Sequence, residues 1–505
     1  MDKKKMNELK RMKVVIIGGG LGGLSCGAIL SKNGYEVTVL EKNAVIGGCL
    51  QCFRRAGKKF ETGMHFVGSV DEGQTLSKLM RYLEIDDVPL QPLDDEAYDV
   101  VSLNGNRYRF AKGRKAFVDG LAASFPSQRE NLERYFDLLS SVANASALHT
   151  MTDSLGDPPL KAEYQLRSVD EVISSVISDP LLQKVLVGCL PLYAGVKGKT
   201  PFSTHAFIVD FYNQSACRVV GGSDAFAASL ERTIKRYGGK VLAGKEAIAI
   251  EFDGNLAKSV VIGGQEAIRA DVVISCIHPR RTMELLDTKF IRPAFRQRLT
   301  ALPNTVSCFV VYVDFKEQAM PYMNSNFYGY RYDTPWDCEK YDESTWPKGY
   351  LYVHMCDKKG QRYASAGEII SYMWPDDVAK WFGTKRGRRG EDYEAFKQQK
   401  AELLIDCVER EFPGFRNAIK QYYTSTPLTY MDYTGTAGGS MYGVAKDITL
   451  GAGGRVPHKT KIPNLYMAGQ NVNSHGMLGV LVGTIVACSE LIPSKTLYTR
   501  INENG

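Results

Sequence analysis

Long hydrophobic runs are missing from this sequence of 505 residues. A membrane-spanning helix needs about 20 consecutive apolar residues, and the nearest approach, residues 477–489, is shorter and contains glycine. The basic start followed by apolar residues is similar to a secretory signal, but its apolar part ends after four residues at a glycine cluster. We therefore expect a cytoplasmic protein with no signal peptide and no transmembrane helix.

The cysteines form no recognisable disulfide framework. There are 11, an odd number, scattered from Cys26 to Cys488, which is typical of a reducing compartment. The one close pair, Cys49 and Cys52, has the spacing of a redox dithiol or of half a zinc site, but no second pair and no histidine pair at ligand spacing accompanies it. We expect no bound metal, and interpret the pair as small residues in a cofactor-covering loop, with a working dithiol as the alternative.

A basic face for nucleic acid is also missing. The formal charge is +7, but residues 1–13 hold six lysines and arginines against Asp2 and Glu8, so this short start carries four of the seven charges. The rest of the chain is nearly neutral, which excludes nucleic acid as the main partner because phosphate neutralisation needs clustered basic residues. We interpret the start as a solvated terminus. The alternative is weak attraction to an anionic membrane surface, which would make the protein peripheral to a membrane.

The sequence does contain a glycine-rich turn after its first apolar run. Hydrophobic residues make up 44% and charged residues 24%, as in a globular protein of two or three domains. Apolar residues 14–17 lead into Gly18, Gly20 and Gly23. This spacing lets a strand turn sharply into a helix, brings the backbone close to a pyrophosphate and packs the helix on the sheet. The pattern predicts a dinucleotide-binding βαβ unit with phosphates at the helix amino terminus.

An acidic residue completes this unit. Residues 36–40 form a second β-rich run that ends at Glu41, about twenty residues beyond the glycines. A carboxylate there accepts hydrogen bonds from a ribose diol and repels a 2′-phosphate, so NADP is disfavoured. Residues 451–454 are also glycine-rich, but no helix pattern and no acidic strand follow them, and we expect a loop. With one nucleotide fingerprint only, the sequence does not specify the electron donor or acceptor.

The remaining chain alternates between helical and β-rich textures. We expect residues 60–68 to form a short strand and turn, and residues 77–148 and 169–192 to be mostly helical. The α/β pattern returns near residue 219, so the opening domain is expected to be discontinuous. The further expected elements are a helix at 224–237, strands at 240–243, 247–252, 270–276, 306–313, 350–354 and 464–469, a helix at 389–412, a loop or twisted strands at 424–443, and a helix beginning near residue 476.

Four motifs together resemble one flavoprotein family over nearly the whole chain. They are residues 47–49 (GGC), 61–68 (ETGMHFVG), 426–429 (TPLT) with Tyr433, and 468–471 (AGQN) with His475 and Gly476. The chain resembles phytoene desaturases, carotenoid isomerases and all-trans-retinol 13,14-reductases, and looks most like the retinol saturase branch.

The resemblance implies an α/β fold with a discontinuous Rossmann-like FAD-binding domain, of the glutathione reductase-like, amine oxidase and phytoene desaturase type, and an α+β substrate domain. We expect the FAD-binding domain to comprise residues 13–75, 215–290 and 455–495, and the substrate domain residues 76–214 and 291–454.

The resemblance also implies a set of FAD contacts. Where many relatives place an arginine after the double glycine, this chain has Cys49, so backbone amides or Lys42 must meet the phosphate charge. The implied contacts are Gly18, Gly20, Leu21, Gly22 and Gly23 to the pyrophosphate, Glu41 to the ribose, Gly48 and Cys49 over the phosphates, Ala247 to the adenine through its backbone, and Gly469, Gln470, Met477 and Leu478 toward the pyrophosphate and isoalloxazine. A helix beginning near Gly476 would aim its positive end at the flavin.

The expected chemistry is hydride transfer at flavin N5 to or from a carbon of an apolar polyene or isoprenoid lipid, such as a retinoid or carotenoid. His65, His475 and Tyr442 are the candidate proton donors, and for each the alternative is a structural hydrogen bond inside the fold. A carotenoid desaturase and a cis-trans isomerase remain alternatives with the same flavin contacts. A prenyl-lipid carrier of the type of the Rab GDP-dissociation inhibitors, without flavin, is the alternative that is not an enzyme.

Overall fold

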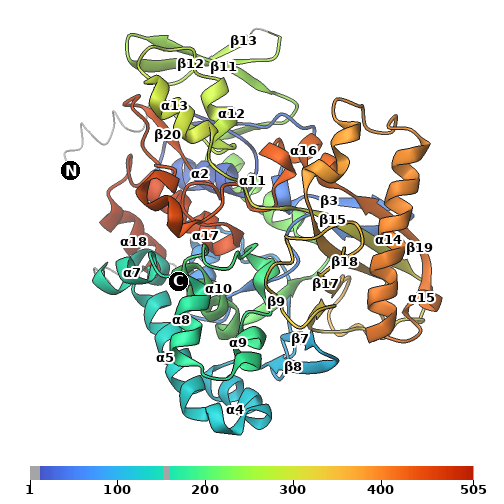
Figure 1. Ribbon diagram of the computed structural model, residues 1–505. Coiled ribbons are helices and arrows are strands. Elements are labelled where there is room, and N and C mark those ends of the chain that lie inside the picture. Colours follow the sequence, from blue (N-terminus) through green and yellow to red (C-terminus); the bar gives the residue numbers. More distant parts are fainter. Residues whose placement is uncertain (1–11, 152–157, 265, 504–505) are drawn as a thin grey trace.

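A parallel sheet of five strands carries the glycine-rich turn. The computed structural model describes residues 12–151, 158–264 and 266–503 (Figure 1). The lysine-rich start up to residue 11 lies outside these residues, and so do the two interpretations of it, a solvated terminus or a segment attracted to a membrane surface. The strands, in spatial order, are β10 (Lys240–Leu242), β2 (Glu36–Leu40), β1 (Lys13–Ile17), β14 (Val272–Ser275) and β20 (Leu465–Met467). They come from three separate stretches of the chain, while the exact domain boundaries stay a prediction.

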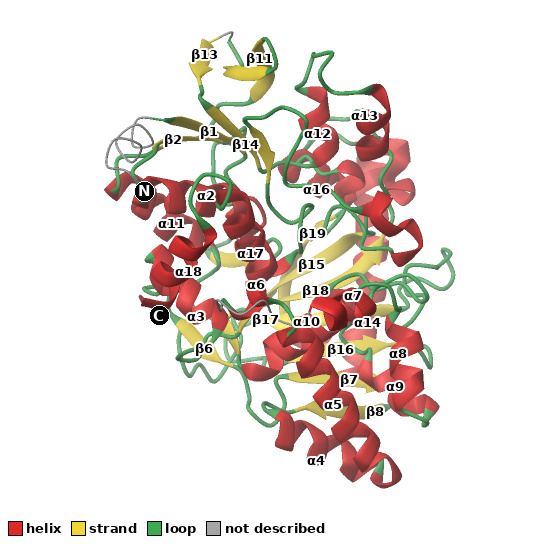
Figure 2. Ribbon diagram, turned by 90° about the vertical axis from the view of Figure 1, so that its left-hand side faces the viewer, coloured by secondary structure: helices red, strands yellow, loops and turns green. Residues whose placement is uncertain are grey.

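The two faces of this sheet are covered differently. Because side chains alternate along a strand, Val14 and Ile16 pack among helices, whereas Val15 and Ile17 pack against a second, antiparallel sheet. In Figure 2 the helices lie below the five strands and the antiparallel sheet lies above them. The helices are α2 (Leu21–Lys32), α11 (Asp224–Arg236) and α17 (Gly476–Cys488), and the second sheet comprises β11 (Ala247–Asp253), β12 (Leu256–Ile262) and β13 (Glu266–Arg269).

A mixed sheet of seven strands forms the centre of the other half. Only the β16–β7 pair in it is parallel. One of its faces packs under α14 (Glu391–Glu411), and the other faces the glycine-rich half of the molecule (Figure 2). Its strands, in order, are β19 (Ile419–Ser425), β15 (Ser307–Phe315), β18 (Ala366–Met373), β17 (Gly349–His354), β16 (Asn326–Tyr330), β7 (Asp99–Leu103) and β8 (Asn106–Phe110).

Helices and two small sheets complete the structure. A helical lobe lies at the lower end in both views (Figures 1 and 2), formed by α4 (Arg114–Ser124), α5 (Arg129–Asn144), α8 (Val169–Val176), α9 (Pro180–Leu186) and α10 (Phe202–Gln214). The other elements are α3 (Thr75–Leu83), α6 (Ala147–Thr150), α7 (Pro158–Tyr164), α12 (Pro279–Glu284), α13 (Pro293–Thr300), α15 (Phe415–Ala418), α16 (Pro427–Thr434), α18 (Ser494–Glu503), the hairpin β3 (Cys52–Arg55) and β4 (Lys58–Glu61), and the sheet β5 (Val67–Gly68), β9 (Ala216–Val219) and β6 (Leu90–Pro92).

One of the expected elements was wrong, and another was incomplete. Residues 77–148 are mostly helical as expected, but the strands β6, β7 and β8 also lie among them. Strand β7 pairs with β16, far along the chain, and this long-range pairing decides its state. Residues 424–443 include the helix α16, which begins at a capping box between Thr426 and Thr429 with Pro427 in its first turn. Residues 451–454, expected as a loop, lie in short 3-10 turns.

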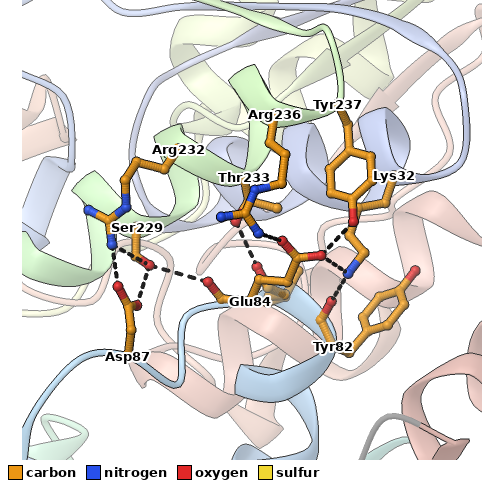
Figure 3. Close-up of polar contacts among 10 residues, drawn as sticks. Lys32, Tyr82, Glu84, Asp87, Ser229, Arg232, Thr233, Arg236 and Tyr237 are labelled. Carbon is orange, nitrogen blue, oxygen red and sulfur yellow. Dashed lines mark hydrogen bonds and ion pairs between the residues drawn. The ribbon is translucent and has the colours of Figure 1, made fainter.

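A polar network beside α2 joins α2 and α11 to the segment that follows α3 (Figure 3). The Glu84 carboxylate accepts hydrogen bonds from Lys32 of α2 and from Tyr237 after α11, and pairs with Arg236. The side chains of Lys32 and Glu84 are only 15% and 23% exposed, so this pair is less screened than a surface ion pair. Burial would raise the pKa of Glu84, but the hydrogen bonds from Lys32 and Tyr237 and the charges of Lys32 and Arg236 lower it overall.

In the part of the chain that the structure describes, no helix has the length and apolar character needed to cross a membrane. In the same residues no three metal-binding side chains cluster where they could hold an ion. All eleven cysteines are free thiols.

Candidate functional site

One elongated cavity of about 620 Å³ joins the glycine-rich turn to the seven-stranded sheet, which is within the size range of ligand pockets. Its first end, the glycine end, is lined by backbone from the start of α2, from the loop after β2 and from the loop before α17. Its second end, the aromatic end, is lined by side chains from the seven-stranded sheet and from the segments around it.

At the glycine end, the glycines of the first turn have different tasks. A Cβ atom on Gly23 would lie 1.8 Å from the carbonyl oxygen of Gly18, so Gly23 serves the packing of helix on strand and does not line the cavity. A Cβ on Gly22 would lie 3.0 Å from the Cα of Gly469, which allows the two loops to meet. A Cβ on Gly20 would approach the protein no closer than 3.8 Å. The absence of a side chain at Gly20 therefore keeps the cavity open and is not needed to avoid a clash within the protein.

Glu41 lies at this end with part of its hydrogen-bonding capacity still available. Its two carboxylate oxygens accept one hydrogen bond each, from the backbone N–H groups of Gly19 (2.9 Å) and Asn43 (2.8 Å). The side chain lines the cavity although the residue is only 7% exposed. Because a carboxylate offers about four acceptor sites, two remain for a ligand.

The loop after β2 and the loop before α17 face each other across the glycine end. The residues that line the cavity here include Lys42, Gly48, Cys49, Gln470 and Ala247 at the start of β11.

The close cysteine pair, Cys49 and Cys52, has unreactive thiols. Burial raises the pKa values of both thiols, and the charge of Glu61 raises that of Cys52 further. Raised thiol pKa values oppose the dithiol alternative, because the thiolate is the reactive form.

Helix α17 begins at Gly476, where the sequence predicted it. Gly476 and Met477 line the cavity, but Leu478 is buried and does not. The unpaired N–H groups of this first turn, like those of α2, lie beside the cavity wall. Two helix amino termini with positive partial charge therefore face the cavity.

The aromatic end is apolar and built on one face of the seven-stranded sheet. In that register Tyr330, Leu351, Ile370, Tyr372 and Cys308 share a face, and all of them line the cavity. The other lining residues of this end include Met64, Phe66, Leu190, Pro191, Leu192, Tyr212, Tyr350, Tyr430 and Met441.

The three candidate proton donors lie in different settings. Tyr442 lines the cavity, but its hydroxyl donates to the carbonyl oxygen of Pro191 at 2.8 Å. His475 is buried against the Tyr442 ring, with centroids 4.4 Å apart, and its Nε2 lies 3.2 Å from the carbonyl oxygen of Leu192. Burial and the charge of Lys446 lower the pKa of His475 to about 4. His65 lines the cavity directly.

His65 has two ionisable neighbours that are far from it in the sequence. Its Nδ1 lies 3.4 Å from Oε2 of Glu368 on β18, and its backbone carbonyl accepts a hydrogen bond from the buried Arg218 on β9. Burial and Arg218 lower the pKa of His65 to about 3. The signal in the sequence is a single charged residue in each of two short apolar strands, Arg218 in β9 and Glu368 in β18.

The chain is similar to known proteins along nearly its whole length. A family model described as flavin containing amine oxidoreductase matches residues 21–489. The chain is 27% identical to all-trans-retinol 13,14-reductase of Rattus norvegicus, over 98% of this chain and 88% of that protein. It is 22% identical to prolycopene isomerase 1 of an Oncidium hybrid cultivar, over 92% of this chain and 81% of that protein. Among solved structures, an oxidoreductase from Methanosarcina mazei has a similar fold, with a TM-score of 0.64 at 18% identity, covering 95% of this chain and 100% of that one.

Proposed function

Because the chain belongs to the family of flavin-containing amine oxidoreductases and is an FAD-dependent oxidoreductase, we propose that it reduces a carbon–carbon double bond of an apolar polyene or isoprenoid lipid. The observation that carries this proposal is the aromatic end of the cavity, where tyrosine, phenylalanine, leucine and methionine side chains form the wall. The name of the relative from Rattus norvegicus, a retinol reductase, points to the same chemistry.

The charges around the cavity argue against an amine as the substrate. The acidic side chains of its lining are Glu41, Glu246 and Glu284, and they lie at the glycine end. A protonated amine at the aromatic end would find no carboxylate in the wall, and burying an unpaired cation is costly. An uncharged polyene carries no such cost, and its transfer from water is favourable.

FAD fits the glycine end. The open space beside Gly20, the two free acceptor sites of Glu41 and the amino terminus of α2 together match a ribose and a pyrophosphate. When bound and reduced, FAD supplies hydride to a carbon atom. The residues that would hold it are those of the expected contact set that line the cavity: Gly18, Gly20, Leu21, Gly22, Glu41, Lys42, Gly48, Cys49, Ala247, Gly469, Gln470 and Met477.

The residues of the aromatic end would then orient the substrate and exclude water. Reduction of a double bond also needs a proton at the second carbon, and a donor must come within hydrogen-bond reach of it. His65 is the best placed of the three candidates, because Tyr442 and His475 already contact backbone carbonyls through their polar atoms. No described residue partners the Nε2 atom of His65.

The relative named prolycopene isomerase supports isomerisation as a second candidate function. An isomerase and a desaturase would use the same cavity, and the products separate the three reactions. A carrier without flavin is not favoured, because the family model that matches is one of flavin-containing enzymes.

Product analysis tests the proposal. The holoprotein is reduced under anaerobic conditions, mixed with all-trans-retinol or a carotenoid, and the extracted lipid is analysed by mass spectrometry. Reduction yields a product heavier by two hydrogens, isomerisation leaves the mass unchanged, and desaturation would require the oxidised protein. If no polyene is converted by either redox form, the proposed substrate class is wrong.

A further inference from the structure

Strand β18 has one charged residue on its cavity face. Side chains alternate along a strand, so Glu368, Ile370 and Tyr372 share a face, and the last two line the cavity. Glu368 is fully buried and lies opposite Tyr312 of β15 and Val353 of β17. A carboxyl group in such a place is costly unless it stays protonated or has a specific partner.

The partner of Glu368 is His65. Oε1 of Glu368 accepts a hydrogen bond of 2.7 Å from the backbone N–H of Glu61, which fixes the carboxyl group. Oε2 lies 3.4 Å from Nδ1 of His65, a close approach without hydrogen-bond geometry, and neither of these two buried atoms has a hydrogen-bond partner among the described residues. The imidazole thus has Nδ1 against the carboxyl group, while its side chain, 14% exposed, reaches the cavity.

The surroundings favour a neutral pair. The titratable and charged groups around Glu368 are His65, Tyr312 and Cys308 of β15, Glu61 of β4 and Arg218 of β9. Burial, followed by the charge of Glu61, raises the pKa of Glu368 well above its usual range, whereas that of His65 is lowered.

The two pKa shifts favour a protonated carboxyl group on Glu368 and an uncharged imidazole on His65. A protonated carboxyl group beside Nδ1 can donate a hydrogen bond to it, and this favours the tautomer with the single ring proton on Nε2.

We propose that Glu368 is a positioning residue that holds His65 in the Nε2–H tautomer and resupplies the proton that His65 gives to the substrate. This inference rests on the proposed function, because only reduction of a double bond consumes a proton at carbon. In the step, the Nε2–H bond of His65 breaks and a C–H bond forms, while the proton of Glu368 moves to Nδ1, so the ring stays neutral.

The carboxylate left on Glu368 is balanced by the buried guanidinium of Arg218, whose charge favours the ionised form of Glu368. After the product leaves, Nε2 takes a proton from water and Nδ1 returns its proton to Glu368. The cycle thus restores both groups and consumes one proton from solvent.

The first test measures the tautomer of His65 in the absence of turnover. The holoprotein with oxidised FAD is labelled with 15N-histidine, and the signal of His65 is assigned by its loss in His65→Gln. The expected spectrum is that of a neutral Nε2–H ring from about pH 5 to 8. A ring with its proton on Nδ1 would mean that Glu368 is an ionised acceptor, and would overturn the inference.

Variants separate positioning from proton supply. Glu368→Gln keeps an acceptor for the Glu61 N–H and a donor for Nδ1, so the tautomer is retained but no proton can be passed on. We expect its rate of flavin reoxidation by a polyene to fall by about 10²-fold. Glu368→Leu removes donor and acceptor, and we expect the His65 signal to shift toward a mixture of tautomers.

Asp99→Asn is the matched control. Asp99 is a second buried carboxyl near Arg218, burial raises its pKa to about 7, and it is paired with Asn326 instead of His65. We expect its tautomer signal and its rate to match the wild type. In the wild type the rate should fall at high pH as Glu368 ionises, and this fall should vanish in Glu368→Gln.

The outcomes are distinguishable. If Glu368→Gln reoxidises as fast as the wild type, proton supply by Glu368 is wrong even when the polyene is reduced. If the wild type is not reoxidised by any polyene, the proposed function is wrong, and the tautomer measurement still decides whether Glu368 orients His65.

Discussion

Replacing Gly20 by alanine separates cofactor binding from folding. Gly20 caps α2 with φ of −80° and ψ of −176°, a conformation open to any residue, and the new Cβ would approach the protein no closer than 3.8 Å, at Gly48 Cα. The apoprotein should therefore fold with an unchanged free energy of unfolding. The methyl group would instead occupy the space in which the backbone approaches the pyrophosphate.

The size of the expected loss of FAD affinity follows from the packing at Gly20. Forcing one extra methyl group into an occupied site costs about 1–3 kcal/mol, and each 1.4 kcal/mol is about tenfold in affinity. We expect FAD to bind Gly20→Ala about 5- to 150-fold more weakly than the wild type. The assay is titration of the apoprotein with FAD, followed by flavin fluorescence, together with the melting temperature of the apoprotein.

Two further glycines provide controls. Gly120 lies in α4, where a Cβ would meet nothing closer than 4.0 Å, so Gly120→Ala should leave FAD affinity unchanged. Gly23→Ala would place a Cβ 1.8 Å from the Gly18 carbonyl oxygen and should destabilise the apoprotein itself. Wild-type FAD affinity in Gly20→Ala, or an apoprotein destabilised as much as in Gly23→Ala, would refute the reasoning.

Three other substitutions give further predictions. Glu41→Arg should lower the flavin content of the purified protein through loss of the ribose hydrogen bonds, and an unchanged absorbance ratio of flavin to protein would contradict this. Glu84→Ala should lower the free energy of unfolding by about 1.5–3 kcal/mol. Because the pKa of Glu84 is lowered in the folded state, this stabilisation is present above the pKa of the unfolded state and is lost as the pH falls through the folded-state pKa. Denaturation curves of the variant and the wild type should therefore converge in acid. Tyr442→Phe should cost about 1 kcal/mol of stability while proton transfer continues, and a loss of turnover as large as in His65→Gln would make Tyr442 the donor instead.

The local motifs of the nucleotide-binding half could be predicted from the sequence. Strands β1 and β2, helix α11 and the start of α17 lie within a residue or two of their expected positions. Each is fixed by a short-range signal, such as the glycine spacing after Ile17 or the strand that ends at Glu41. Such signals depend on residues that are neighbours in the chain.

The aromatic end and the environment of His65 could not be predicted in this way. Strand β7 pairs with β16, and the carboxyl group of Glu368 accepts from the backbone of a residue 307 positions earlier. These contacts arise from the order of strands in the sheet, which local periodicity does not encode. The sequence therefore pointed to His65 as a candidate, but not to the acid behind it.

Anaerobic mixing of the reduced holoprotein with a polyene tests the central claim most directly, because the spectrum reports flavin and substrate at once. We predict that the absorption bands of oxidised flavin return while the long-wavelength band of the polyene shifts to shorter wavelength, in equal molar amounts. A purified protein that contains no flavin and takes up none, or a reduced flavin that stays reduced with every retinoid and carotenoid offered, would contradict the account.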